Sequence, residues 1–147
     1  MMETLIIDAS IAVKWVVEED GTEAAIAMRS RFRFAAPDLL VAECSNILWK
    51  KVQRGNLTKE EAVMAGRLLE RSDVELLPMR GILEQATTLA IELDHPAYDC
   101  VYLALAHQRQ QRFVTADQRL LRVIASKASD NLAELCIALD QVHGESR

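Results

Sequence analysis

The stretch Thr4-Leu5-Ile6-Ile7-Asp8, near the start of the chain, suggests the fold of the whole sequence. Its apolar, β-branched run is typical of a buried strand, and the strand ends at an aspartate. Similar short runs recur along the chain and alternate with segments whose apolar residues follow helical spacing. This alternation predicts an α/β fold with a mainly parallel central sheet of four to five strands. Ligands bind outside the carboxyl ends of such strands, so Asp8 and Asp117 are candidate functional residues.

The expected elements follow one another without a linker or a repeat. Strands are expected at residues 4–8, 32–36, 74–77, 112–115 and 134–139. Helices are expected at residues 11–18, 23–31, 37–54, 58–71, 82–93, 97–111 and 118–128. Ser10 can cap the first helix, and Pro37 fits the first turn of the third. Gly55 is expected to end that third helix, and Thr58 to Glu61 form a capping box for the next.

Composition limits the classes of protein to consider. The chain has 147 residues, half of them hydrophobic, and 17 Lys and Arg against 22 Asp and Glu give a formal charge of −5. We expect one domain, residues 1–147, and the apolar content excludes a disordered chain. No apolar run approaches the ~20 residues of a membrane span and no secretory signal is visible, which predicts a cytoplasmic protein. The cysteines Cys44, Cys100 and Cys136 lie far apart in apolar runs, which predicts core residues and not disulfides or a zinc site.

Four acidic residues have apolar neighbours: Asp8, Glu43, Asp99 and Asp117. Most other acids, including those of the segment Glu18-Glu19-Asp20, lie in polar stretches and are expected on solvated faces. A buried carboxylate is costly unless it is paired or bound to a metal. Each of these four acids also has an ordinary explanation, such as a bond to turn amides for Asp8 or a helix cap for Asp117.

Taken together, the four acids suggest a common site. Two follow strands, and two lie in the first turns of apolar helices, which a parallel sheet can bring to the same edge. Converging carboxylates select hard cations such as Mg²⁺ or Mn²⁺. The chemistry that uses an all-carboxylate cluster is phosphodiester hydrolysis. An acidic protein is poorly suited to coating nucleic acid, but one or two bound divalent cations would reduce the formal charge to about −3 to −1.

Four segments together resemble the PIN domain and, more closely, the VapC toxins of prokaryotic toxin–antitoxin pairs. These segments are Ile7-Asp8-Ala9-Ser10, Pro37 to Glu43 with Asn46, Tyr98-Asp99 with the run to Ala106, and Val114-Thr115-Ala116-Asp117. The resemblance extends over essentially the whole chain. It implies a three-layer α/β/α domain and an endoribonuclease dependent on Mg²⁺ or Mn²⁺. It also implies that Asp8, Glu43, Asp99 and Asp117 hold the metal.

Three residues match supporting positions of that family. Ser10 and Thr115 correspond to hydroxyl groups beside the acids, although a helix cap and a strand-end hydroxyl would explain them equally well. Asn46 lies three residues after Glu43 on the same helix face. It could hydrogen-bond to that ligand, or it could be an ordinary buried amide.

The resemblance further implies a homodimer, an RNA substrate and a cognate antitoxin, with DNA contacted only through the antitoxin. Trp15, Val16 and the helix 23–31 are candidate walls of the groove for the antitoxin, although Trp15 and Trp49 could also be core residues. RNA needs cations for its backbone. The candidates are Lys50, Lys51, Arg54, Arg109, Arg112 and Arg119.

Other interpretations are less well supported. A haloacid-dehalogenase phosphatase would need a second aspartate where Ser10 stands, and five glycines include no phosphate-binding loop. His95, His107 and His143 have no matched nucleophile and are expected to be ordinary surface or loop histidines. The alternative from another class is a catalytically silent module with the same fold that acts only by binding its partner.

Overall fold

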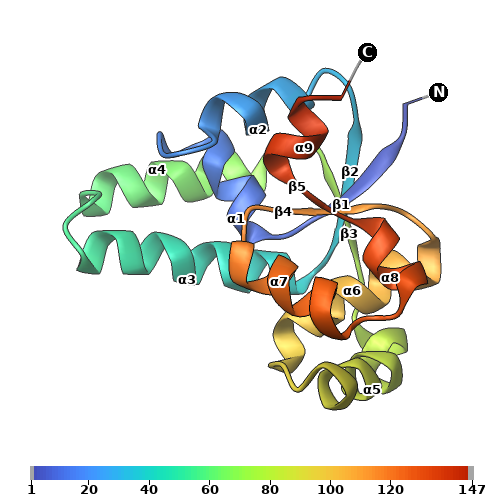
Figure 1. The fold of residues 1–147 in the computed structure, drawn as a ribbon. Coiled ribbons are helices and arrows are strands. Elements are labelled where there is room, and N and C mark those ends of the chain that lie inside the picture. The colour runs from blue at the N-terminus through green and yellow to red at the C-terminus, as the bar shows by residue number, and fades with distance from the viewer. Residues whose placement is uncertain (1, 146–147) are drawn as a thin grey trace.

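Five strands form a parallel sheet at the centre of the molecule (Figure 1). The computed structural model describes residues 2–145. The order across the sheet is β3 (Val74–Leu77), β2 (Arg33–Pro37), β1 (Thr4–Ile7), β4 (Phe113–Thr115) and β5 (Cys136–Ala138). All four pairings are parallel, with Ile6 beside Ala35 and Ile7 beside Val114. The predicted α/β class with a parallel sheet is therefore confirmed.

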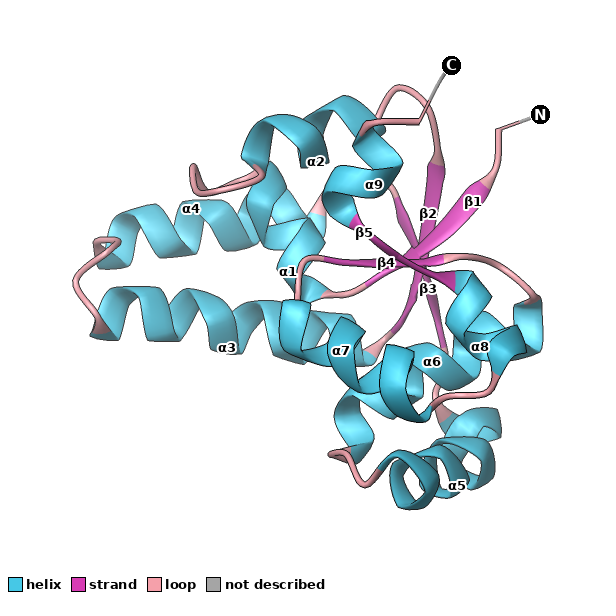
Figure 2. Ribbon diagram, in the orientation of Figure 1, coloured by secondary structure: helices cyan, strands magenta, loops and turns pink. Residues whose placement is uncertain are grey.

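Helices cover both faces of this sheet, which gives the predicted three layers (Figure 2). On one face lie α1 (Ala9–Ala12), its continuation η1 (Val13–Trp15), α2 (Thr22–Met28), α3 (Leu39–Gln53), α4 (Lys59–Glu70) and α9 (Leu139–His143). On the other lie η2 (Arg80–Ile82), α5 (Leu83–Leu93), α6 (Ala97–Arg109), α7 (Gln118–Lys127) and α8 (Asp130–Leu135). Right-handed crossovers explain the division, because the chain moves one way along the sheet from β1 to β3 and the other way from β4 to β5. α3 and α4 run past the sheet as an antiparallel pair, the arm seen at the left of Figure 1.

The reversal of direction places β1 beside β4, and their carboxyl ends form the topological switch point of the sheet. This is where open α/β sheets bind ligands. The core lies directly behind it, since Leu5, Ile6 and Ile7 of β1 and Leu103 of α6 have no exposed surface. Asp8 and Asp117 follow these two strands and are thereby brought to one edge.

Several features predicted from short stretches of sequence are present in the structure. Thr58 and Glu61 form the predicted capping box at the start of α4. Gly55 follows α3 with a φ of 78°, a left-handed conformation that glycine adopts without strain. Cys44 and Cys100 are buried and Cys136 is half-buried, all as free thiols.

Three expectations about elements were wrong. Pro37 ends β2, paired with Leu77, and does not open α3. Asp8 and not Ser10 caps α1, because the Asp8 carboxylate accepts the amide of Ser10, and the first helix ends at Trp15. Residues 134–139 contain only the three-residue β5, flanked by two short helices that the sequence pattern did not reveal. Within residues 2–145, no helix has both the length and the apolar character needed to cross a bilayer.

Candidate active site

A cavity of about 370 Å³ opens at the carboxyl ends of β1 and β4. All four acids singled out in the sequence contribute to its wall, as do Ser10 and Asn46; the lining is Asp8, Ala9, Ser10, Leu39, Ala42, Glu43, Asn46, Ile47, Tyr98, Asp99 and Asp117. The acids come from four separate elements: the end of β1, α3, α6 and the start of α7. Their meeting at one cavity is a property of the tertiary fold.

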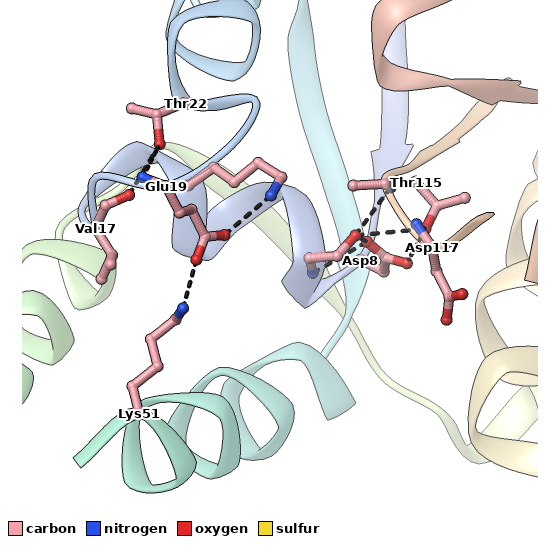
Figure 3. Close-up of polar contacts among 10 residues, drawn as sticks. Asp8, Val17, Glu19, Thr22, Lys51, Thr115 and Asp117 are labelled. Carbon is pink, nitrogen blue, oxygen red and sulfur yellow. Dashed lines mark hydrogen bonds and ion pairs between the residues drawn. The ribbon is translucent and has the colours of Figure 1, made fainter. Parts of the chain in front are cut away.

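Asp8 is the most buried of the four acids, with 7% of its surface exposed. Its Oδ1 accepts the Ser10 amide at 3.1 Å and the Ser10 hydroxyl at 2.5 Å, and its Oδ2 accepts the Thr115 hydroxyl at 2.5 Å (Figure 3). Burial raises the pKa of Asp8 to about 6; the two hydroxyl donors oppose this shift, and the charges of Asp99 and Glu43 add to it. The carboxylates thus repel one another across the cavity.

Ser10 and Thr115 connect the segments that follow β1 and β4. Each hydroxyl donates to Asp8 and accepts a backbone amide in return: Ala116 N–H on Ser10 Oγ at 3.0 Å and Asp117 N–H on Thr115 Oγ1 at 3.0 Å. Thr115 is fully buried. Both hydroxyls are therefore directed by two bonds each, and they hold the Asp8 carboxylate in one orientation.

Asp117 serves as a helix cap while facing the cavity. Its Oδ1 accepts the amide of Leu120 at 3.1 Å, which caps α7. Its carboxylate points away from that of Asp8 (Figure 3). Asp117 is therefore a helix cap, as one interpretation predicted. Its exposed side chain also forms part of the cavity wall.

Glu43 has a partner that sequence reasoning missed. Its Oε1 accepts the hydroxyl of Tyr102 at 2.5 Å. Burial raises the pKa of Glu43; the Tyr102 hydroxyl opposes this and the charge of Asp99 adds to it. Tyr102 has no exposed surface. A tyrosine inside an otherwise apolar helix was the available signal, because a buried phenol needs a hydrogen-bond partner.

His95 was expected to be an ordinary surface or loop histidine; it does lie in the loop before α6, but it contacts one of the four acids. Its Nε2 donates to Asp99 Oδ2 at 2.6 Å, and only 12% of its side chain is exposed. The two residues are four apart, on either side of the Pro96 cap at the start of α6. That spacing was a signal for contact within one helical turn.

Asn46 is exposed on α3 and lines the cavity, so it is not a buried amide. Within residues 2–145, no hydrogen bond joins it to Glu43. Its amide is available to a ligand in the cavity.

The donor set suits a hard cation, although no three His, Cys, Asp or Glu side chains of residues 2–145 are clustered tightly enough to hold a metal as they stand. The cavity offers four carboxylates and one carboxamide, which are the oxygen ligands that Mg²⁺ and Mn²⁺ prefer. Repulsion between Asp8, Glu43 and Asp99 is a second indication of a cation site, because a divalent cation would relieve this repulsion. Holding one would require side chains such as Asp117 to turn inward.

A second, larger cavity of about 600 Å³ lies between α3, α4 and β3. Its lining includes Leu48, Trp49 and Val63, and 57% of Trp49 is exposed. Trp15, by contrast, is buried and donates its indole N–H to the Ala25 carbonyl at 2.9 Å. Of the two tryptophans considered for the core, Trp15 is therefore in it and Trp49 is not.

The candidate cations for RNA divide into two groups. Lys51 pairs with Glu19 at 2.5 Å, Arg112 with Glu3 and Glu145 at 2.8 Å each, and Arg109 lies 3.7 Å from Glu75. Lys50, Arg54 and Arg119 are exposed and make no ion pair within the described part of the chain.

Comparisons with known proteins agree with this fold. The family model for the PIN domain matches residues 5–125. Ribonuclease VapC3 of Pyrobaculum aerophilum is 31% identical over 122 residues, which cover 79% of this chain and 91% of that relative. The crystal structure of PAE2754 from Pyrobaculum aerophilum aligns with 97% of this chain and 93% of its own at a TM-score of 0.71 and 21% identity. The sarcin-ricin loop cleaving toxin VapC20 of Mycobacterium tuberculosis aligns with 83% and 94% at a TM-score of 0.65 and 14% identity.

Proposed function

This chain belongs to the PIN-domain family, and from that premise we propose that it is a Mg²⁺- or Mn²⁺-dependent endoribonuclease that acts as the toxin of a toxin–antitoxin pair. The observation that carries the proposal is the cavity that Asp8, Glu43, Asp99 and Asp117 share at the switch point of the sheet. The relative at 31% identity is a ribonuclease by name, which favours RNA as the substrate.

Asp8, Glu43, Asp99 and Asp117 are the residues that would hold the metal. A bound Mg²⁺ or Mn²⁺ supplies Lewis-acid chemistry, lowering the pKa of bound water and stabilising the charge that develops on the phosphate. The protein contributes orientation: Ser10 and Thr115 fix Asp8, Tyr102 fixes Glu43 and His95 fixes Asp99. Hydrogen bonds of this kind set which oxygen a carboxylate presents to a ligand.

Asn46, Lys50 and Arg119 are the side chains we assign to the RNA backbone. Asn46 lines the cavity, and Lys50 lies one helical turn beyond it on α3. Arg119 follows Asp117 by two residues and is exposed. Phosphate contacts of this type position an RNA without reading its sequence.

We further propose that the antitoxin binds in the apolar cavity between α3 and α4, which replaces the groove expected at Trp15 and Val16. Trp15 is buried in the core, whereas Trp49, Val41 and Val63 line the α3–α4 cavity with 47–59% of their surfaces exposed. An exposed apolar patch of this kind indicates a protein-binding surface. A homodimer, location in the cytoplasm and contact with DNA only through the antitoxin complete the proposal.

Two faces of α3 connect this surface to the active site. Leu40, Cys44 and Leu48 face the apolar cavity, while Glu43, Asn46 and Ile47 face the acidic one. A partner seated on the first face therefore lies one helix width from the second. This arrangement lets an antitoxin cover or reach the acids, which is how binding would inhibit cleavage.

The test is RNA cleavage by purified, partner-free protein with Mg²⁺, with Mn²⁺ and with EDTA. We expect cleavage only with metal, and we expect Asp8→Asn to abolish both cleavage and toxicity on expression while the circular dichroism spectrum is retained. Asp20→Asn, which removes an exposed carboxylate outside the cavity, is the matched control and should cleave normally.

The alternative, a silent module that acts by binding alone, gives the opposite result. Wild-type protein would then cleave no RNA pool under any metal condition, and Asp8→Asn would be as toxic as wild type.

A further inference from the structure

Tyr98 is a large aromatic side chain that the fold leaves exposed inside the acidic cavity. It lines that cavity next to Asp99, yet 67% of its surface is accessible to solvent. Of the seven aromatic residues in the chain, all within residues 2–145, only Tyr98 and Trp49 are exposed. In the same range the Tyr98 hydroxyl has no hydrogen-bond partner. Neither packing nor hydrogen bonding among residues 2–145 therefore accounts for the position of the ring.

The register of α6 fixes where the ring lies. Tyr98 precedes Tyr102 by one helical turn on the same face. Tyr102 is buried, and its hydroxyl contacts Glu43, another residue of the cavity wall. This face of α6 thus runs from the interior at Tyr102 to solvent at Tyr98. Tyr98 is at the mouth of the cavity, beside the carboxylates that would hold the metal.

The remainder of the wall suits a flat, partly apolar group. Leu39, Ala42 and Ile47 of α3 and Ala9 of α1 contribute apolar surface alongside the acids. A nucleobase combines a π-face that stacks on aromatic rings with a phosphodiester that needs cations, and the two parts match the two kinds of wall. Bases inside a double helix are already stacked and cannot reach such a ring.

We propose that Tyr98 is a stacking platform for a nucleobase of the RNA next to the scissile phosphate. The inference rests on the proposed ribonuclease function and deepens it. Because every base has a π-face, the contact does not select a particular base. The hydroxyl plays no part, so phenylalanine should replace tyrosine at this position.

The experiment measures RNA binding apart from cleavage. Fluorescence anisotropy in the Asp8→Asn background, with Mg²⁺ present, compares a single-stranded oligoribonucleotide with a strand of the same length built from abasic nucleotides. We expect the additional change Tyr98→Ala to weaken binding of the intact strand about tenfold and Tyr98→Phe to leave it unchanged. The abasic strand should bind to the protein that retains Tyr98 about tenfold less tightly than the intact strand does. Tyr98→Ala should not weaken binding of the abasic strand any further. Ile91→Ala, at an apolar residue of α5 that is 75% exposed, is the matched control.

Catalysis gives the second readout. In the otherwise wild-type enzyme, Tyr98→Ala should lower kcat/KM about tenfold on a single strand, and Tyr98→Phe should leave it unchanged. Equal binding by Tyr98→Ala, or an additive effect of the abasic strand, overturns the proposal. Loss of antitoxin binding with unchanged RNA binding also overturns it and assigns the ring to the protein partner.

Failure of the proposed ribonuclease function gives a different result. Wild-type protein then cuts no RNA, but anisotropy still measures whether Tyr98 contributes to RNA binding. Wild type that neither cuts nor binds RNA overturns both.

Discussion

At the scale of single residues, the acidic site depends on hydrogen-bond donors that orient three of its four carboxylates. Thr115 and Ser10 donate to Asp8, Tyr102 donates to Glu43, and His95 donates to Asp99. Without them, carboxylates that repel one another would be free to turn toward solvent. The partners therefore matter to metal binding even though they are not proposed as ligands.

Tyr102→Phe tests this role. The ring should still pack against Phe113, whose centroid lies 6.0 Å away, so the fold is retained. Glu43 loses its donor, and we expect the Kd for Mn²⁺ measured by titration calorimetry to rise about tenfold, with a parallel loss of RNA cleavage. Tyr98→Phe removes the other tyrosine hydroxyl, which has no partner among residues 2–145, and should leave the metal affinity unchanged. Equal affinities in wild type and Tyr102→Phe would contradict the role assigned here.

At the scale of elements, Glu19 links the segment after η1 to α3. Its carboxylate accepts Lys14 at 3.0 Å and Lys51 at 2.5 Å, and its backbone amide donates to Thr22 (Figure 3). Glu19 was expected on a solvated face; instead only 23% of its side chain is exposed. Lys51, a candidate for RNA, is engaged in this link. The link ties α3, the helix shared by both cavities, to the body of the domain.

Glu19→Gln should destabilise the protein in a pH-dependent way. Burial opposes ionisation, but hydrogen bonds from Lys51 and Lys14 outweigh it and hold the pKa of Glu19 below its usual 4.5. The ionised group therefore adds stability that is complete above pH 4.5 and is lost as the pH falls through the lower, folded-state pKa. Urea denaturation should give a free energy of unfolding about 1 kcal/mol lower for Glu19→Gln at pH 7, with the difference vanishing toward pH 3.

Glu18→Gln is the control for this change. Glu18 is exposed and makes no ion pair within residues 2–145, so its removal should have no effect at either pH. A Glu19→Gln penalty that stays constant from pH 7 to pH 3 would mean that packing and not charge holds the segment.

At the scale of the whole molecule, two cavities of different chemistry share one wall. The acidic cavity opens where β1 meets β4, and the apolar one lies between α3, α4 and β3. The first suits a metal and an RNA backbone, and the second suits an apolar segment of a protein. The proposed function uses both surfaces, the first for cleavage of RNA and the second for inhibition by an antitoxin.

Val63→Asp separates the two surfaces. Val63 lines the apolar cavity from α4, and 47% of it is exposed, so the fold should tolerate the change. A carboxylate buried against an apolar partner is costly, and we expect the Kd for the proposed antitoxin to rise about 100-fold or more. RNA cleavage without antitoxin should stay at the wild-type rate. Leu83→Asp, on α5 of the other face, should bind antitoxin normally; loss of binding in both variants would remove the support for this site.

The sequence by itself determined the features that depend on near neighbours. The alternation of strands and helices, the capping box at Thr58 and the stop at Gly55 are local, and all were predictable. Pro37 was misplaced because its ring suits a first helical turn and a strand end alike, and tertiary pairing with β3 decided between them. The short helices around β5 were missed because six or fewer residues carry too little periodicity to read.

The apolar neighbours of Asp8, Glu43, Asp99 and Asp117 in the sequence were enough to mark these acids as candidates, but their hydrogen-bond partners depended on the fold. Thr115 is 107 residues from Asp8, and Tyr102 is 59 from Glu43. Two features of the fold decide which side chains meet. One is the strand order, which puts β1 beside β4, and the other is the rotation of α3 and α6 about their axes. Propensity and spacing act over a few residues, whereas these contacts depend on how whole elements pack, and for that reason the tertiary structure alone decided them.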